Sequence, residues 1–559
     1  MPMFRLLLAL LAGLALLAQP ALAARTLIIN ANGYMFDGTG MLRRFGTLFI
    51  GADGKVLATL PKGAAEPKLE VGDYRLDAKG QTLLPGLIDG HGHLLGLGLR
   101  LRLLDLGGAR SVAEAQAAIA RYAAANANAK WIAGGGWNQE QWGEGGRSRF
   151  PTRAELDAAT GDKPAALARV DGHALWVNSA ALKAAGITRA TKDPPGGRIL
   201  RDAAGNPSGI LVDTAIALVE KARPKPGAGE AEKALEAALA HMASVGLTGL
   251  HDMGTTPDDW ALIRAFGDEG RLTARITAYA AGIESMEAIA PLRPTPWLYQ
   301  DRLRLIGIKF LADGALGSRG AWLLAPYADE PTTRGLQLLD DTRQKNWLSR
   351  ANFLGYQVAI HAIGDAANRQ VLDSFAEILP TYGDRFRNRV EHAQVVNPAD
   401  IPRFAALKLT ASMQPTHGPS DMLMAETRLG PDRLDGAFAW KRFLTANVPL
   451  VLGSDTPVEP ANPFFGIHAA VTRQTREGAP PGGWRMADAL TLEQALQGFT
   501  TSAALAGHME GRVGTLTPGA WADFILLDRD PFTIPPTDLW KILVQETWLA
   551  GGRIYVRNP

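Results

Sequence analysis

Eight short apolar runs, separated by stretches with helical periodicity, fill the middle of the chain. The runs are mainly continuous rather than alternating in hydrophobicity, which is typical of parallel strands that helices cover. Stretches such as GEAEKALEAALAHMAS and DAANRQVLDSFAEIL lie between the runs and have the spacing of amphipathic helices. Strands and helices that alternate in this way predict an α/β fold, a (β/α)8 barrel of the TIM type. The runs span residues 83–93, 245–254, 274–280, 303–314, 356–365, 389–396, 409–417 and 449–458.

The two ends of the chain have a different pattern. Residues 26–84 contain short apolar runs with Asp-Gly and Lys-Gly turns between them, and the segments GRVGTLTPGAWADFILLDRDPF and ETWLAGGRIYV near the C-terminus are similar. Both ends are therefore expected to be β-rich. Because chain termini often lie close together in a folded unit, the two pieces could pair into one β-sandwich.

Residues 95–240 are too long for a single connection between a strand and a helix, and they contain strand and helix patterns of their own. We interpret them as a large insertion after the first barrel strand. Such an insertion would rise from the C-terminal rim of the barrel, where it could cover the active site.

The first 23 residues have the pattern of a signal peptide. One arginine precedes an apolar run over residues 6–18, and the small-residue sequence Ala-Leu-Ala ends at Ala23. The alternative is a retained membrane anchor, but a helix of this length spans only about 20 Å, whereas a bilayer core is about 30 Å thick. We therefore expect cleavage after Ala23 and a periplasmic or secreted protein with no membrane association after cleavage.

Composition narrows the chemistry. The 58 Lys and Arg residues nearly balance the 56 Asp and Glu residues, so the chain lacks the basic excess that nucleic-acid binding requires. There is no cysteine, which excludes thiolate metal sites and cysteine nucleophiles. A metal ion would have to be bound by His, Asp, Glu or a modified Lys, and the chain has ten histidines.

Polar residues stand at or near the C-terminal ends of the predicted strands, where a barrel holds its active site. His91 and His93 are two residues apart on a predicted strand, so both side chains would point to one face and could bind one ion. A charged Lys309 inside an apolar strand needs either a partner or a modification. The full set predicts a metal site and consists of His91, His93, Lys309, His361, His392 and Asp455.

The motif LLPGLIDGHGH, followed by this order of Lys, His, His and Asp, resembles the metal-binding signature of the amidohydrolase superfamily. Further segments are similar to its YtcJ-like branch, amidohydrolase 3, which includes N-substituted formamide deformylases. The resemblance covers nearly all of the chain after residue 23. The segments are VDGHALWVNSAAL, GLTGLHDMG, KFLADGALGSRGAWL, VAIHAIGDAAN, RVEHAQ and GSDTPVEPANPFFGIHAAVTR.

The resemblance implies a barrel over residues 85–505 and a split β-sandwich formed by residues 24–84 and 506–559. It also implies two divalent metal ions, usually Zn2+. By the same resemblance His91, His93 and Asp455 bind the first ion, His361 and His392 bind the second, and an N6-carboxylated Lys309 bridges both. The alternative is an unmodified Lys309 beside a single ion.

The resemblance implies a metal-dependent hydrolase of non-peptide carbon-nitrogen bonds (EC 3.5), with an amide, formamide or N-acyl compound as its small-molecule substrate. The signal-peptide pattern adds the expectation that this hydrolase is exported. The nucleophile would be a metal-activated hydroxide, and Asp455 would shuttle the proton. The same centre could instead hydrolyse lactones or other esters. A third alternative, a non-catalytic binding protein that keeps the fold, is disfavoured because all six metal-site positions are filled.

His173, in the insertion, matches a family motif, and we expect it to contact the substrate or an oxyanion as a catalytic residue. Weaker candidates for substrate contacts are Asn178, Ser318, Arg319 and His417, for which structural roles are the alternative. Asp365 and Glu391 could orient ligand imidazoles. The sequence predicts no nucleic-acid partner, is compatible with a homodimer, and does not identify the exact substrate.

Overall fold

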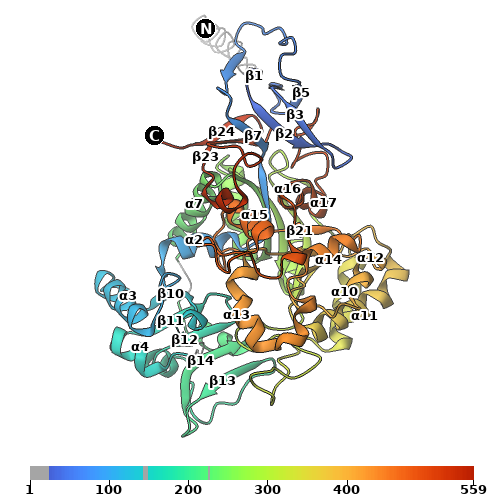
Figure 1. The fold of residues 1–559 in the computed structure, drawn as a ribbon. Coiled ribbons are helices and arrows are strands. Elements are labelled where there is room, and N and C mark those ends of the chain that lie inside the picture. The colour runs from blue at the N-terminus through green and yellow to red at the C-terminus, as the bar shows by residue number, and fades with distance from the viewer. Residues whose placement is uncertain (1–23, 143–148, 225–226, 559) are drawn as a thin grey trace, which may run out of the picture.

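The computed structural model describes residues 24–142, 149–224 and 227–558, and a sheet of eight parallel strands lies at its centre (Figure 1). An isolated parallel bridge between Gly92 and Thr456 links the first strand of this sheet to the segment after the last. The predicted α/β class and eight-stranded barrel are thus confirmed. The strands in order are β8 (Leu87–Gly92), β15 (Leu247–Thr255), β16 (Arg275–Ala281), β17 (Leu303–Leu311), β18 (Gln357–Ala362), β19 (Arg389–His392), β20 (Thr410–Met413) and β21 (Leu450–Leu452).

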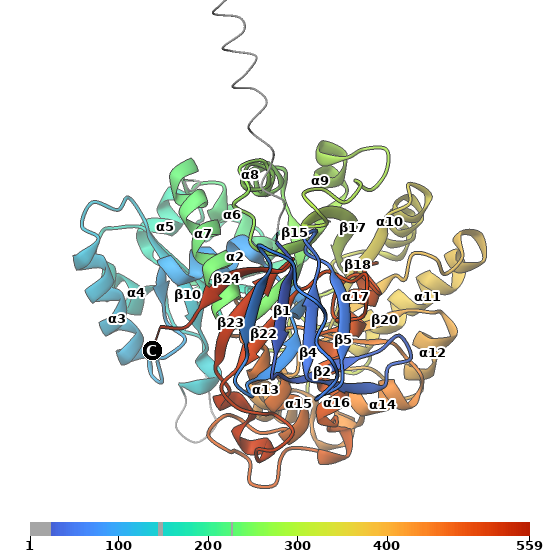
Figure 2. The same cartoon turned by 90° about the horizontal axis from the view of Figure 1, so that it is seen from above.

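Helices surround the barrel and bury the outer faces of its strands, as Figure 2 shows from above. Sequence signals set their ends: α8, for example, starts at Pro257 after an N-cap Thr256 whose side chain accepts a hydrogen bond from the Asp259 amide. The helices between consecutive strands include α7 (Ala228–Ser244), α8 (Pro257–Asp268), α9 (Gly282–Ile289), α10 (Asp341–Phe353), α11 (Asp365–Tyr382), α12 (Ile401–Ala406), α13 (His417–Leu429) and α14 (Trp440–Thr445).

Strands from both ends of the chain share one six-stranded sheet, in the order β24-β23-β22-β7-β2-β3. A second sheet, β5-β4-β1-β6, contains only N-terminal strands, and both sheets lie at one end of the barrel (Figure 1). The strands are β1 (Thr26–Ile29), β2 (Asn32–Phe36), β3 (Leu42–Phe45), β4 (Thr47–Ile50), β5 (Val56–Leu60), β6 (Tyr74–Asp77), β7 (Thr82–Pro85), β22 (Phe524–Leu527), β23 (Val544–Leu549) and β24 (Gly552–Val556).

The predicted first barrel strand, 83–93, is in fact two strands. β7 belongs to the sheet of the termini and β8 to the barrel, and Gly86 joins them. A Cβ atom at Gly86 would lie 2.2 Å from the Thr248 hydroxyl oxygen, so only glycine allows the chain to cross at this point. The apolar pattern continues from β7 into β8 without a break, so the sequence did not indicate that the chain passes from one sheet to another here.

Residues between β8 and α7 form a third unit at the opposite end of the barrel from the sheets of the termini (Figure 1). Its six-stranded sheet has the order β13-β14-β12-β11-β10-β9, and Trp137 and Trp176 are fully buried in its own apolar core. We call this sheet and its helices α3 (Val112–Ala125), α4 (Arg153–Thr160) and α5 (Ser179–Ala184) the cover unit. Its strands are β9 (Leu104–Asp105), β10 (Ile132–Trp137), β11 (Ala165–Arg169), β12 (Ala174–Val177), β13 (Gly197–Arg201) and β14 (Pro207–Asp213).

The predicted signal peptide lies outside the described residues. Among the residues that are described, none of the helices combines the length and the apolar character needed to cross a bilayer.

A buried ion pair joins the barrel to the sheet of the termini. Arg275, at the start of β16, donates two hydrogen bonds to Asp523, with N···O distances of 2.6 and 2.9 Å. Both side chains are almost completely buried, and the guanidinium also lies over the Trp521 ring. The pair therefore links the two units through one desolvated contact.

We predict that Asp523→Asn lowers the free energy of unfolding by about 3–5 kcal/mol, because it leaves the buried Arg275 charge without a counter-ion. Chemical denaturation followed by circular dichroism measures the change. As a control, Asp538→Asn removes an exposed partner of Lys541, and its effect is expected to stay below about 1 kcal/mol. Equal effects of the two variants would show that the buried pair does not hold the units together.

Candidate metal centre

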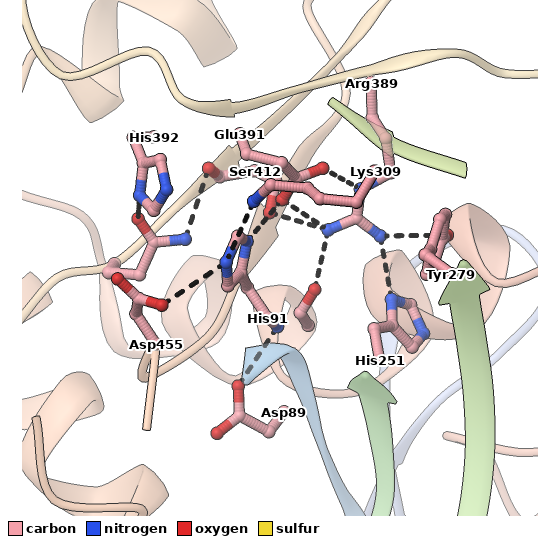
Figure 3. A network of polar contacts seen from close by, with 12 residues as sticks. Asp89, His91, His251, Tyr279, Lys309, Arg389, Glu391, His392, Ser412 and Asp455 are labelled. Atoms are coloured by element: carbon pink, nitrogen blue, oxygen red, sulfur yellow. Dashed lines mark hydrogen bonds and ion pairs between the residues drawn. The ribbon is translucent and has the colours of Figure 1, made fainter. Parts of the chain in front are cut away.

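The centre is built on a histidine whose orientation is fixed by a buried carboxylate. His91, on β8, and Glu391, on β19, are both fully buried, and Nδ1 of His91 lies 2.6 Å from Oε2 of Glu391 (Figure 3). With the proton of Nδ1 donated to Glu391, Nε2 carries the lone pair that a metal ion requires. Glu391 thus contacts the imidazole of His91, a candidate metal ligand, and fixes its orientation.

Glu391 is held in turn by Arg389, which lies two residues earlier on β19 and so faces the same side of the sheet. This guanidinium is fully buried and also donates to the Gly90 carbonyl oxygen and the Ser412 hydroxyl (Figure 3). Burial alone would raise the pKa of Glu391, but the Arg389 charge, the hydrogen bond and charge of His91 and the Lys309 charge together outweigh burial and lower that pKa far below its usual value. Glu391 is thus a permanent carboxylate at neutral pH.

His251, on β15, belongs to the same network. Its Nδ1 accepts a hydrogen bond of 2.8 Å from Arg389. Burial and the Arg389 charge lower the pKa of His251 well below its usual value, so the ring is neutral.

Asp455 belongs to the first group of side chains that could hold a metal ion. Its Oδ1 lies 3.3 Å from Nε2 of His91 and 3.2 Å from Nε2 of His93. The three ligand atoms lie within 4.8 Å of one another. His93 is not on the strand, as the His-x-His spacing suggested, but at the N-cap of α2 (Leu94–Arg102). The backbone of His93 is still extended, with φ of −127° and ψ of 98°, so the two histidines point to the same side as they would on a strand.

Asp455 also belongs to a second group, with His392 and His417. Its Oδ2 lies 3.4 Å from Nε2 of His417. Nδ1 of His392 faces the Gln414 side-chain oxygen at 2.8 Å, which leaves Nε2 of His392 for an ion. The structure thus places His417, expected only as a substrate contact, among the potential metal ligands.

His361 lies beside this second group. Its ring centroid is 4.6 Å from that of His392. Nε2 of His361 is 3.4 Å from both the Gly314 carbonyl oxygen and the Asp313 carboxylate, so Nδ1 is the nitrogen left for a ligand bond. Asp313 is itself fixed by the backbone amides of Trp322, Ile363 and Gly364.

Lys309 reaches the middle of the cluster from β17. It is almost completely buried, and its Nζ lies 3.4 Å from Nε2 of His91 (Figure 3). Desolvation lowers the pKa of Lys309 to about 8, against the pull of Glu391 and Asp455. The side chain therefore lies against His91 and loses its proton more readily than an exposed lysine.

Two of the cluster residues have strained backbones. His392 has a φ of 74° and Asp455 a φ of 59°, in the left-handed region that non-glycine residues rarely adopt. Such strain is concentrated at functional sites, where the surrounding structure holds it. His392 is the last residue of β19, and Asp455 lies in the segment that follows β21.

Three of the predicted substrate contacts have other roles in the structure. The Asn178 side chain is fully buried and caps α5, and its amide is used by Ala165, Ala181, Thr160 and Lys163. Ser318 is fully buried in the loop after β17, with its hydroxyl on the Ala315 carbonyl oxygen. Arg319, in the same loop, pairs with Asp329 and Glu330. Their polar atoms are occupied by protein partners.

His173, by contrast, comes from the cover unit to the barrel. Its ring centroid lies 5.1 Å from that of His361, and its Nδ1 is 2.6 Å from Oδ1 of Asp213. Burial lowers its affinity for a proton, but Asp213 outweighs this and raises the pKa of His173 to about 9. The sequence singled out neither Asp213 nor Arg389 nor Asp313, because their partners lie on other strands. Polar residues inside apolar strand patterns were the available signal for Arg389.

The fold and this cluster define a metal-dependent hydrolase of the barrel type. Residues 76–555 match the model of the amidohydrolase family, and the chain belongs to that family. It is 34% identical over 491 residues to "Putative amidohydrolase YtcJ" of Bacillus subtilis, which covers 86% of this chain and 90% of the relative.

It is 27% identical over 552 residues to the N-substituted formamide deformylase of Arthrobacter pascens, covering 95% of this chain and 98% of that enzyme. The crystal structure of an uncharacterized metal-dependent hydrolase from Pyrococcus horikoshii superposes with a TM-score of 0.74 at 28% identity. That match covers 92% of this chain and 99% of the archaeal one.

We predict that Glu391→Gln weakens zinc binding about 10–100-fold, because His91 loses the carboxylate that fixes its tautomer and raises its basicity. Competition with a chromophoric chelator measures the affinity. Asp365→Asn is the control and should leave the zinc affinity unchanged. The sequence suggested that Asp365 also orients a ligand imidazole, but in the structure this carboxylate, at the start of α11, accepts a hydrogen bond from the Leu324 amide. Unchanged affinity in Glu391→Gln would mean that the His91–Glu391 contact is only structural.

Proposed function

We propose that the protein hydrolyses a carbon-nitrogen bond of a small amide, formamide or N-acyl compound, with two divalent metal ions, Zn2+ by preference. One observation carries the proposal: two groups of ligand atoms share Asp455 between them. The similarity to a formamide deformylase over nearly the whole of both chains favours a carbon-nitrogen bond over the ester or lactone bond that such a centre could also attack.

The donor set fits divalent ions of the zinc type. It consists of imidazole nitrogens and carboxylate oxygens, which zinc accepts in catalytic sites. His91 and His392 each have one ring nitrogen engaged by a side-chain oxygen, as metal-binding histidines almost always do. His91, His93 and Asp455 would hold one ion, and His361 and His392 the other. His417 is a further ligand candidate for the second ion.

Such ions supply a hydroxide nucleophile at neutral pH and polarise the carbonyl under attack. Asp455 is placed to move the proton. One carboxylate oxygen faces His91 and His93, while the other faces His417 and can accept a proton from the attacking water and pass it to the departing amine. His173 lies against His361, where its ring can donate a hydrogen bond to the carbonyl oxygen of the substrate.

Lys309 is proposed to be carboxylated at its amine and to bridge the two ions. A neutral amine attacks CO2, and desolvation favours the neutral form of Lys309. The resulting carbamate would replace a buried positive charge by an oxygen ligand among the histidines.

Export to the periplasm or the medium, after cleavage at Ala23, is part of the same proposal, and N-terminal sequencing of the mature protein tests it.

We predict that Asp455→Asn lowers kcat for an N-formyl amine by about 10²–10⁴, the range that a positioned proton-transfer group contributes. Steady-state assays on metal-loaded protein, with metal content measured on the same sample, separate lost proton transfer from lost metal. Wild-type protein stripped by a chelator should lose activity and regain it with zinc. Wild-type protein that binds two ions per chain but hydrolyses esters alone would contradict the carbon-nitrogen assignment.

We further predict a carbamate signal on Lys309. Protein incubated with 13C-bicarbonate and zinc should give a carbamate carbon resonance in the NMR spectrum, and Lys309→Met should lack it. The exposed Lys541 offers a matched control, since Lys541→Met should leave the resonance unchanged. Absence of the resonance in wild-type protein that holds zinc would support an unmodified lysine beside a single ion.

A further inference from the structure

The cover unit brings two side chains together at its contact with the barrel. His173 directly precedes β12, and Asp213 ends β14, the antiparallel neighbour of β12. The Asp213 amide donates to the His173 carbonyl oxygen, and the His173 ring donates through Nδ1 to Oδ1 of Asp213 at 2.6 Å. Backbone and side chain thus hold the pair at two points.

Asp213 is costly for the fold. Its φ of 49° and ψ of −123° are unusual for a residue with a side chain. Its carboxylate is almost completely buried, and within the described chain Oδ2 has no hydrogen-bonding partner. A buried carboxylate with an unsatisfied oxygen requires an explanation, because burial of such a group is unfavourable.

The barrel is shaped around this carboxylate. Gly314 and Gly320, in the loop that follows β17 and Lys309, approach so closely that a Cβ atom at either position would lie 2.7 Å from Oδ2 of Asp213. The carbonyl oxygen of Gly314 also faces His361. Asp213 is therefore wedged between the cover unit and the loop that supports one of the candidate metal ligands.

The other end of the pair faces the metal centre. The His173 ring lies against the His361 ring, and its side chain is 16% exposed. In the part of the chain that the structure describes, Nε2 of His173 has no hydrogen-bonding partner. The turn that carries this ring is fixed by Asp171, which accepts a hydrogen bond from the His173 amide.

We propose that Asp213 is a positioning residue for the reaction: it fixes the His173 ring so that Nε2 points at the oxygen of the substrate carbonyl and donates a hydrogen bond to it as negative charge develops. The proposal rests on the proposed hydrolysis. This role explains why a carboxylate with a strained backbone is buried at position 213. It also means that the cover unit contributes to catalysis through His173. In catalytic triads a carboxylate that binds Nδ1 of a histidine likewise orients the ring, so that Nε2 can act on the substrate.

A double-mutant cycle on the zinc-loaded full chain tests the proposal. We expect His173→Asn to lower kcat by about 10²-fold, the typical loss for one oxyanion donor, and Asp213→Asn by about tenfold or more, with KM changed by less than about threefold. The double variant should be no slower than His173→Asn alone, because Asp213 acts only through the ring. Asp193→Asn makes the same change of charge at an exposed residue of the cover unit and should leave kcat unchanged.

A second readout does not depend on turnover. In 15N-histidine-labelled protein the strong Nδ1–H···carboxylate hydrogen bond should give a low-field proton signal, lost in Asp213→Asn and His173→Asn and kept in Asp193→Asn. Metal content and melting temperature are measured on each variant, and all should retain zinc. Asparagine has the same size and shape as aspartate, so Asp213→Asn changes the charge of this side chain without changing its volume.

Additive losses in the double variant, or a loss of kcat in Asp213→Asn that matches its loss of zinc, would overturn the positioning role. A wild-type protein that opens lactones but not amides would overturn the proposed function and leave this test intact, because an oxyanion forms in both reactions. The cycle is then measured on the lactone.

Discussion

The whole active site depends on a pair of opposite charges buried in the centre of the barrel. Arg389 and Glu391 are both fully excluded from solvent. Separated, either charge would be strongly unfavourable at this depth, and together they are stable only if their remaining hydrogen-bonding groups are satisfied. The Gly90 carbonyl oxygen, Ser412 and His91 meet that requirement. The ion pair therefore ties β8, β19 and β20 to one another and fixes the first candidate ligand.

This arrangement explains why the barrel interior is polar although its strands look apolar in sequence. The outward faces of the strands pack against helices in the large apolar core, while the inward faces carry the polar network. In a parallel strand covered by helices both faces avoid water, so a polar residue among apolar ones marks the inner face. Lys309 and Arg389 follow this rule.

Sequence reasoning could predict the barrel and propose six metal-site residues, because each of those residues lies at or near the C-terminal end of a predicted strand and the chemistry of its side chain is distinctive. It could not predict Asp213 or Asp313, since both act through partners that are distant in sequence. It named Asn178 as a weaker candidate for a substrate contact, with a structural role as the alternative, and the amide in fact caps a helix in the cover unit. Residue type and motif do not show whether an asparagine side chain caps a helix or binds a substrate. The hydrogen bonds in the structure make that distinction.

The centre is finally an assembly of two separately packed units. The barrel contributes the candidate ligands, and the cover unit has its own core and contributes His173. A nearly buried Arg428 on α13 joins them, since it donates to Glu140 of the cover unit at 2.6 Å and pairs with Asp329 of the barrel loop. The same helix begins with His417. A change in how the cover unit packs would therefore move both the proposed oxyanion donor and one ligand candidate, while the ion pair in the barrel stays fixed. His91 would keep its orientation, because the Arg389–Glu391 pair that fixes it lies entirely within the barrel.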